Sequence, residues 1–196
     1  GNGGGGAGAA ADAGGALVAL GRGAHRDLGH APARYDLALA TARLTRVIDY
    51  TPADMTVAVE AGVTFAELAA MLAREGQWLP LEPPLPAATT VGGLLATDRS
   101  GLLAAAEGRV RDFVIGIGAV TATGTPVRAG GRVVKNVAGY DLMKLFVGSL
   151  GTLSVLTEAT FKVRPLPESQ HVIVLPVASI SAALALGRSV DRALAV

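Results

Sequence analysis

The chain has 196 residues with a formal net charge of +1, and 51% of its residues are hydrophobic, 4% aromatic and 17% charged. The near-neutral charge argues against a protein that binds nucleic acid through a basic face. Because the sequence has no Cys, it excludes a disulfide scaffold, a Cys-bound zinc or iron-sulfur centre and a catalytic thiol. The longest uncharged apolar run is broken by Pro176 and is too short to span a bilayer, so we expect no transmembrane segment.

The start of the chain is low-complexity Gly and Ala up to Gly15, and we expect residues 1–6 to be disordered. Its letters satisfy G-x-G-x-x-G, but no strand precedes them, so they do not predict a dinucleotide fingerprint. Residues 16–20 (ALVAL) have the form of a buried strand and are followed by a Gly-punctuated loop at 21–29. A strand that runs into such a loop is the first place where we expect a ligand.

The middle of the chain predicts a strand, a turn and a helix. Residues 55–60 alternate apolar and polar side chains, as in a half-buried strand. Thr64 followed by Glu67 has the spacing of a capping box for a helix that ends at Gly76. Residues 77–81 then have the pattern of an extended segment.

The second half is predicted to be mostly strands. Residues 113–123 and 127–128 flank a turn and indicate a hairpin. Asp141 is expected to cap a short helix at 142–147. Residues 153–164 alternate regularly, which predicts a long strand with one exposed face. The predicted buried face of that strand comprises Val155, Thr157, Ala159, Phe161 and Val163.

The last predicted elements are a short strand at 171–175 and an amphipathic helix at 180–194. Strands and helices are thus mixed without strict βαβ alternation. This order favours the α+β fold class over a doubly wound parallel sheet.

Two stretches carry more information than periodicity. One runs from 131 to 158 and contains KNVAGYDLMKLFVGSLGTL; the other comprises ATTVGG at 88–93, Ser100-Gly101 and RVRDFVIG at 109–116. Together they resemble the FAD-binding domain of the vanillyl-alcohol oxidase, or PCMH, type of flavoprotein. Within that type they most resemble the FAD-binding E-subunit family of bacterial glycolate oxidase. The resemblance extends from about residue 17 to 167.

The resemblance implies an α+β fold of two subdomains with FAD between them, followed by a cap domain over the substrate. On this basis residues 1–15 are a low-complexity start and residues 16–167 are the PCMH-type FAD-binding domain. Residues 168–196 are then the start of a cap domain, most of which is missing.

The resemblance also implies which residues bind the cofactor. Gly residues suit a loop that presents backbone N–H groups to the pyrophosphate of FAD. Such a loop can bind the phosphates in a protein without an excess of basic residues. In this chain Arg22 and Ala24 stand where the family usually has Gly and a Ser or Thr, and Leu102-Leu103 stands where it often has Pro and Arg. The implied cofactor-binding residues are Gly21, Arg22, Gly23, Ala24, His25, Thr90, Gly92, Gly93, Ser100, Gly101, Arg111, Asp112, Gly148, Gly151, Val155 and Thr157.

Several of these residues have a structural alternative. Gly92 and Gly93 either clear space for the flavin ring or permit tight helix packing. Arg111-Asp112 is either a structural ion pair or a group that orients the flavin. Lys135 is either a cofactor ligand or a structural residue. The sequence predicts no metal site, since the three His are scattered, and it assigns no catalytic residue.

The function implied by the resemblance is that of a glycolate, or 2-hydroxy-acid, oxidase in which FAD accepts a hydride from the substrate. The implied partners are a second flavin subunit and an iron-sulfur subunit, which would take the electrons onward. The implied location is cytoplasmic, at the inner membrane where the partners hold the chain there. The alternatives are a stand-alone FAD-linked dehydrogenase of the D-lactate type and a truncated chain that binds flavin in a structural role.

Overall fold

The computed structural model describes residues 14–30, 33–131, 142–171 and 173–194, without the side chains of 191, 193 and 194. The expected disorder of residues 1–6, the role of Lys135 and the cap at Asp141 fall outside the described residues. The chain divides between Leu166 and Pro167 into two compact units, which are described separately.

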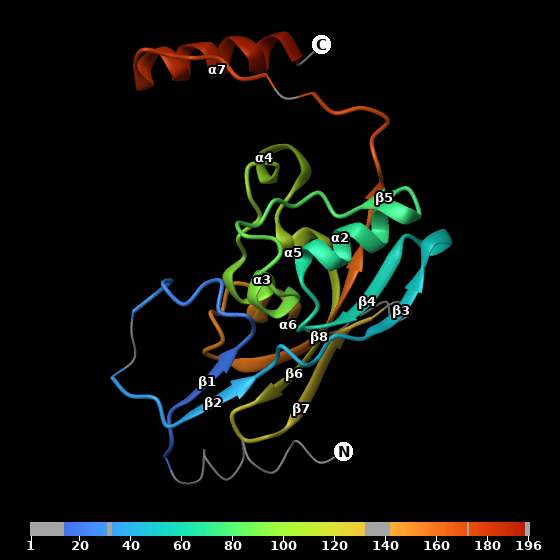
Figure 1. The fold of residues 1–196 in the computed structure, drawn as a ribbon, viewed down its shortest axis with the longest axis vertical. Coiled ribbons are helices and arrows are strands. Elements are labelled where there is room, and N and C mark those ends of the chain that lie inside the picture. The colour runs from blue at the N-terminus through green and yellow to red at the C-terminus, as the bar shows by residue number, and fades with distance from the viewer. Residues whose placement is uncertain (1–13, 31–32, 132–141, 172, 195–196) are drawn as a thin grey trace. The chain divides into compact units, whose positions relative to one another are not determined.

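The first unit mixes strands and short helices, which confirms the predicted α+β class (Figure 1). Its strands are β1 (Leu17–Leu20), β2 (Leu37–Ala40), β3 (Val47–Thr51), β4 (Thr56–Glu60), β5 (Gln77–Trp78), β6 (Val114–Thr121), β7 (Pro126–Gly130), β8 (Ser154–Lys162) and β9 (Arg164–Pro165). Its helices are α2 (Phe65–Arg74), α3 (Val91–Thr97), α4 (Ala104–Glu107), α5 (Val110–Phe113) and α6 (Leu142–Phe146), with a 3-10 turn η1 (Pro52–Asp54).

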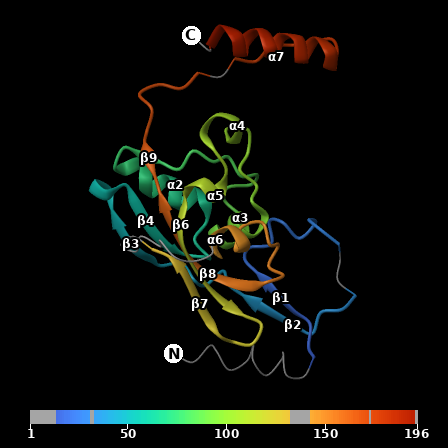
Figure 2. The ribbon, with the colours of Figure 1, turned by 180° about the vertical axis from the view of Figure 1, so that it is seen from behind.

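The main sheet has five antiparallel strands in the order β3-β4-β8-β6-β7. A separate parallel pair, β1-β2, lies beside it, and both views show the end of β1 next to α3 (Figure 2). Val57 of β4 and Phe161 of β8 pack with Leu68 of α2 and Leu94 of α3, and all four are fully buried. The helices α2 and α3 therefore share one core with the centre of the sheet.

Local sequence signals explain the order of these elements. Thr64 accepts the N–H of Glu67, and the Glu67 carboxylate accepts the N–H of Thr64, so the predicted capping box starts α2. Gly76 follows the helix with a φ of +62°, a conformation that suits Gly. The predicted hairpin is formed by β6 and β7 around Gly124, which has a φ of +79°.

The alternation predicted for β8 is wrong in its first half. Leu156, rather than Val155 or Thr157, is buried there, whereas Ala159 and Phe161 are buried as predicted. The register explains the difference, because Gly118 of β6 pairs with Glu158 while Ala119 pairs with Leu156. Thr157 is thus the extra residue of a β-bulge, and the bulge exchanges the two faces of the strand.

The second unit begins at Pro167 and contains α7 (Ile180–Leu194), which confirms the predicted C-terminal helix. The strand predicted at 171–175 is wrong for the described residues of that range, which are irregular. Ile173 and Val174 are 81% and 84% exposed, and within the described part of the chain no neighbouring strand supplies the hydrogen bonds that a strand needs. Among the described helices, none has the length and apolar character needed to span a membrane.

Candidate cofactor-binding site

The loop that follows β1 lies against the start of α3. A Cβ atom on Gly21 would come 2.5 Å from the hydroxyl oxygen of Thr90. That hydroxyl accepts the N–H of Gly93 at 3.2 Å and caps α3, so its position is fixed. At the other end of the loop, Nε2 of His25 lies 3.3 Å from Oγ1 of Thr89. Two segments predicted to hold the cofactor, 21–25 and 90–93, are therefore in contact.

Backbone hydrogen bonds tie the start of α3 to the loop after β4 and to the bulge of β8. The N–H of Gly92 donates to the carbonyl of Ala61 at 2.8 Å, and the N–H of Ala61 donates to the carbonyl of Thr157 at 2.9 Å. Thr64 and Thr90 form an isolated antiparallel bridge next to them. The bulge therefore places Thr157 within the hydrogen-bonded network that holds α3.

Gly62 connects the ends of β1 and β2 to the same point. Its N–H donates to the carbonyl of Leu44 at 2.7 Å, and a Cβ atom on it would collide with the carbonyl of Thr41. The N–H of Thr41 donates in turn to the carbonyl of Leu20, the last residue of β1, at 2.8 Å. Because backbone carbonyls surround this position, a larger residue would require the chain to shift.

The far end of α3 contacts the segment that follows α6. The N–H of Gly148 donates to the carbonyl of Leu95 at 2.9 Å, and the N–H of Leu150 donates to that of Ala96 at 2.8 Å. A Cβ atom on Gly151 would have no neighbour within 4 Å in the described part of the chain. Gly148 thus contacts α3, whereas Gly151 belongs to the turn before β8. We call the meeting point of these segments the α3 junction, which comprises residues 20–25, 41–44, 61–63, 89–98, 148–150 and 157.

The paired glycines of α3 contact protein atoms. A Cβ atom on Gly92 would lie 3.1 Å from Cβ of Ala61, so tight packing accounts for this Gly. A Cβ atom on Gly93 would lie 3.4 Å from Cδ2 of His25. Gly93 therefore marks the place where α3 and the His25 ring approach each other.

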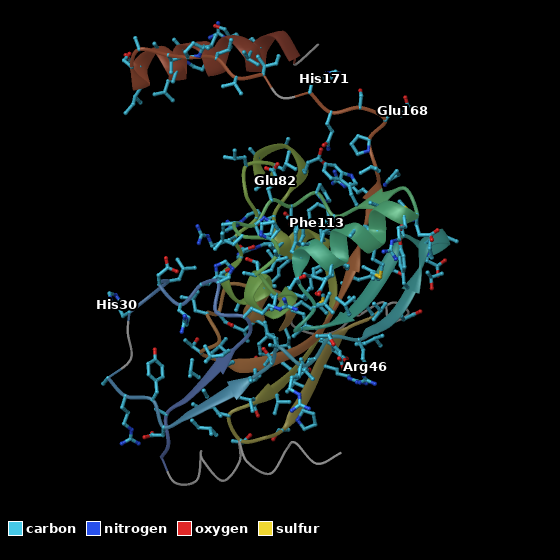
Figure 3. All side chains as sticks on the ribbon, in the orientation of Figure 1. His30, Arg46, Glu82, Phe113, Glu168 and His171 are labelled. Atoms are coloured by element: carbon cyan, nitrogen blue, oxygen red, sulfur yellow. The ribbon has the colours of Figure 1, made fainter. Side chains whose placement is uncertain are left out.

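Ser100 and Gly101 hold the turn after α3, and their contacts join it to α5 and to Glu82. Oγ of Ser100 accepts the N–H of Val110 at 2.9 Å, which joins this turn to α5. Gly101 has a φ of +82°, and a Cβ atom on it would collide with the backbone of Glu82, a residue labelled in Figure 3. These two residues fix the direction of the chain as it leaves α3.

Asp98 follows the last residue of α3 and forms ion pairs with two arginines. Its side chain is 5% exposed, and its Oδ2 lies 2.7 Å from Nη2 of Arg109 and 3.3 Å from Nη2 of Arg111. Asp112 instead accepts the backbone N–H of Arg109 at 2.7 Å. An ion pair between Arg111 and Asp112, one of the two predicted roles, is therefore wrong, because adjacent residues of a helix do not face each other.

Charged groups near the loop at 21–25 act on Arg22 and His25. Arg22 turns toward α2, where its Nη2 lies 3.5 Å from the exposed carboxylate of Glu67, a weak pair at this exposure. Burial of the ring, and next the charge of Arg99, lower the pKa of His25, whereas Asp27 raises it. The lowered pKa keeps His25 neutral at neutral pH.

Buried polar atoms without partners gather at the α3 junction. Among the described residues, five buried side-chain polar atoms have no hydrogen-bond partner, and three of them belong to the junction. Such atoms are rare in folded proteins unless a ligand or water completes them. FAD carries both hydrogen-bond donors and acceptors, so the junction fits this group. The three atoms are Nδ1 of His25, Oδ1 of Asp98 and Oγ of Ser149.

The remaining predicted residues lie outside these contacts. Val155 is half-buried on β8 and pairs with Val120 of β6. His30 and His171 are exposed, and they belong to different units of the chain. In the described ranges, no group of three His, Cys, Asp or Glu side chains is placed to bind a metal ion.

The sequence did not single out several residues that build the junction. Thr41 and Ala61 act through backbone groups, which leave no signature in side-chain patterns. Asp98 has a φ of +50° after the end of α3, and an Asp directly after a helical pattern is the signal that points to it. Thr89 was adjacent to a predicted residue but is distinguished only by its contact with His25.

Comparisons with known proteins identify the family of the chain. A family model described as an FAD binding domain matches residues 7–130. The chain is 34% identical over 167 residues to glycolate oxidase subunit GlcD of Bacillus subtilis, an alignment that covers 85% of this chain and 36% of that one. It is 42% identical over 124 residues to glycolate oxidase subunit GlcE of Escherichia coli, with 63% and 35% covered.

A D-lactate dehydrogenase of Archaeoglobus fulgidus is 37% identical over 149 residues, which are 76% of this chain and 33% of the relative. The chain thus spans about a third of the length of these curated relatives. Among solved structures, alkyldihydroxyacetonephosphate synthase superimposes with a TM-score of 0.67 at 26% identity, covering 83% of this chain and 30% of that one.

Proposed function

The chain belongs to the FAD-binding domain family, and on that premise we propose that it is the FAD-binding part of an oxidoreductase that acts on small 2-hydroxy acids. The family membership confirms the predicted resemblance and the predicted cofactor, FAD. The α3 junction is the observation that carries the proposal. There the predicted loop at 21–25 contacts the predicted segment at 90–93, and buried polar atoms lack partners.

The residues of the junction would bind and orient the cofactor. Backbone N–H groups of the loop at 21–25 suit a pyrophosphate, and Arg99 adds positive charge close to His25. The pairing of Asp98 with Arg109 and Arg111 fixes the end of α3, and with it the position of Gly148. When bound, FAD supplies the capacity to accept a hydride from the α-carbon of a 2-hydroxy acid.

In finer detail, we propose a subunit of a glycolate oxidase type of complex. Two of the relatives are named glycolate oxidase subunits, which supports assembly with other subunits. The proposed partners are a second flavin subunit and an iron-sulfur subunit. The sequence has no Cys to bind an iron-sulfur cluster, so such a cluster would belong to a partner. We further propose a cytoplasmic location, at the inner membrane through those partners.

A stand-alone dehydrogenase of the D-lactate type is the second candidate. It is favoured by the similarity to a D-lactate dehydrogenase and by a relative named D-2-hydroxyglutarate dehydrogenase, which is 30% identical over 151 residues. Both candidates use the same cofactor, and they differ in the substrate and in the need for a partner.

A visible spectrum of the purified chain tests the proposal. We expect flavin absorption bands after incubation with FAD and gel filtration, and release of the flavin on denaturation. Anaerobic addition of glycolate, D-lactate or 2-hydroxyglutarate then shows whether this chain alone reduces its flavin. Reduction by D-lactate without a partner favours the second candidate, and a requirement for added subunits favours the first. A folded chain that stays colourless contradicts both.

A further inference from the structure

His25 occupies a defined position between the loop after β1 and the start of α3. Its Nε2 lies 3.3 Å from Oγ1 of Thr89, and its Cδ2 faces Gly93. Thr89 is fully buried. The ring is therefore held by the segment that leads into α3 and not only by its own loop.

Thr89 determines which nitrogen of His25 carries the proton. The hydroxyl of Thr89 donates its single hydrogen to the carbonyl of Pro84 at 2.6 Å. Toward His25 the hydroxyl oxygen can then only accept, so Nε2 must be the donor. When the ring is neutral, Nδ1 carries no proton and is a hydrogen-bond acceptor.

The surroundings of the ring keep it neutral. Thr89, just before α3, and Gly93 of α3 are its uncharged neighbours, and the charged groups that act on it are Arg99 and Asp27. Burial and Arg99 oppose a charged ring, and only Asp27 favours it.

The acceptor at Nδ1 has no donor. It is buried, and no N–H or O–H group of the described chain reaches it. A ligand with a hydrogen-bond donor can supply the missing bond, whereas a phosphate oxygen, which is itself an acceptor at neutral pH, cannot. Because protein atoms now cover Nδ1, the ring or the loop must shift for a ligand to reach it.

We infer that the imidazole ring of His25 binds a hydroxyl group of the ribityl chain or of the ribose of FAD through Nδ1, and that this ring does not bind the FAD phosphates. The inference rests on the proposed function and assigns a side-chain role within it. The hydroxyl donates its hydrogen to Nδ1, while Thr89 holds the opposite side of the ring. His25 thus recognises a hydroxyl-bearing part of the cofactor, which is either the ribityl chain or the ribose.

Two amide substitutions distinguish the roles of the two ring nitrogens of His25. In His25→Gln the amide reaches the position of Nε2, so the contact with Thr89 is kept and the Nδ1 acceptor is lost. In His25→Asn the amide reaches the position of Nδ1, so the acceptor is kept. We expect the FAD dissociation constant, measured by flavin fluorescence titration, to rise about tenfold in His25→Gln and at most about threefold in His25→Asn.

Titrations with ADP identify the hydroxyl. A loss for both FAD and ADP in His25→Gln places it on the ribose, and a loss for FAD alone places it on the ribityl chain; either result supports the inference. Wild-type affinity should also fall as the pH is lowered through the pKa of His25, because protonation removes the acceptor. Tighter FAD binding in acid would mean that a charged His25 donates to phosphate, and it would overturn the inference.

Nitrogen-15 NMR of the histidines provides a readout that needs no cofactor. At pH 7.5 we expect the neutral Nε2–H tautomer for His25, and we expect this preference to weaken in Thr89→Val. The Nδ1–H tautomer in the wild type would overturn the inference. A wild-type chain that binds no FAD overturns the proposed function and this inference together. Equal FAD binding by the wild type and His25→Gln overturns this inference alone.

Discussion

Two regions of the first unit differ in whether their buried polar groups have hydrogen-bond partners. In the region around β4 and α2, Glu60 accepts the N–H and the Nε–H of Arg46, and Gln77 donates to the carbonyl of Pro52 and accepts from Tyr50. In the α3 junction, His25 and two further side chains have a buried polar atom without a partner. Thr56 Oγ1 is an exception within the first region. Apart from that hydroxyl, the polar groups named in the first region are paired within the protein, whereas we propose that a ligand completes the three unpaired atoms of the junction.

The largest effect is expected where the two regions join, at Gly62→Ala. The added methyl group collides with the carbonyls of Thr41 and Leu44, which belong to fixed backbone. We expect a loss of about 3 kcal/mol in the free energy of unfolding, measured by urea denaturation. Gly187→Ala in α7 is the matched control, because it meets no atom within 4 Å in the described structure. A loss of similar size in the control would contradict the role of the collision.

Glu60→Gln tests the region around β4 and α2, where buried polar groups are paired within the protein. The hydrogen bond from Arg46 is the main cause that lowers the pKa of Glu60, and burial acts in the opposite direction. A lowered folded-state pKa stabilises the fold above the unfolded-state value of about 4.5, and this contribution is lost as the pH falls through the folded-state value. We expect the substitution to cost about 2 kcal/mol at pH 7.

The pH dependence provides the check on Glu60. Urea unfolding between pH 7 and pH 3 should show a larger loss of stability in the wild type than in Glu60→Gln. Parallel curves for the two proteins would mean that the pair with Arg46 contributes nothing.

Gly21→Ala tests the contact that assembles the junction. The new Cβ would lie 2.5 Å from the Thr90 hydroxyl, and we expect a loss of about 1.5 kcal/mol in stability together with weaker FAD binding. The double variant with Thr90→Ala removes the colliding atom. Unfolding measurements on the full mutant cycle should give a coupling of about 1 kcal/mol, and strict additivity would contradict the contact.

The smallest effects compare one group from each region. Thr64→Ala removes the satisfied cap of α2 and should cost about 1 kcal/mol in stability. Ser149→Ala removes a hydroxyl that has no hydrogen-bond partner among the described residues, so the cofactor-free stability should change by less than about 0.5 kcal/mol. If Ser149→Ala destabilises the cofactor-free chain as much as Thr64→Ala does, the contrast between the regions is wrong.

The same contrast separates what the sequence could and could not predict. The capping box of α2, the hairpin at Gly124 and the helix from Ile180 have local signals, and each was predicted. The bulge at Thr157 has no local signal, because it depends on how β8 pairs with β6. The strand predicted at 171–175 failed for a related reason, since an apolar run needs a neighbouring strand.

At the candidate site, family motifs identified the segments but not their contacts. They indicated the loop at 21–25 and the glycines of α3, which the structure brings together. Arg111-Asp112 was interpreted either as an ion pair or as a group that orients the flavin, and the structure pairs Arg111 with Asp98, which is distant in sequence. Backbone contacts such as that between Ala61 and Gly92 need the folded chain to be seen.

The most direct test of the account is an amide NMR titration of the chain with FAD. The account predicts that the largest chemical-shift changes fall on residues 21–25, 89–98 and 148–150. The amides from Phe65 to Gln77, in and after α2, should change little. Saturable binding with changes centred on α2 or α7, or no binding of FAD to a folded chain, would contradict the claim that the α3 junction is the cofactor site.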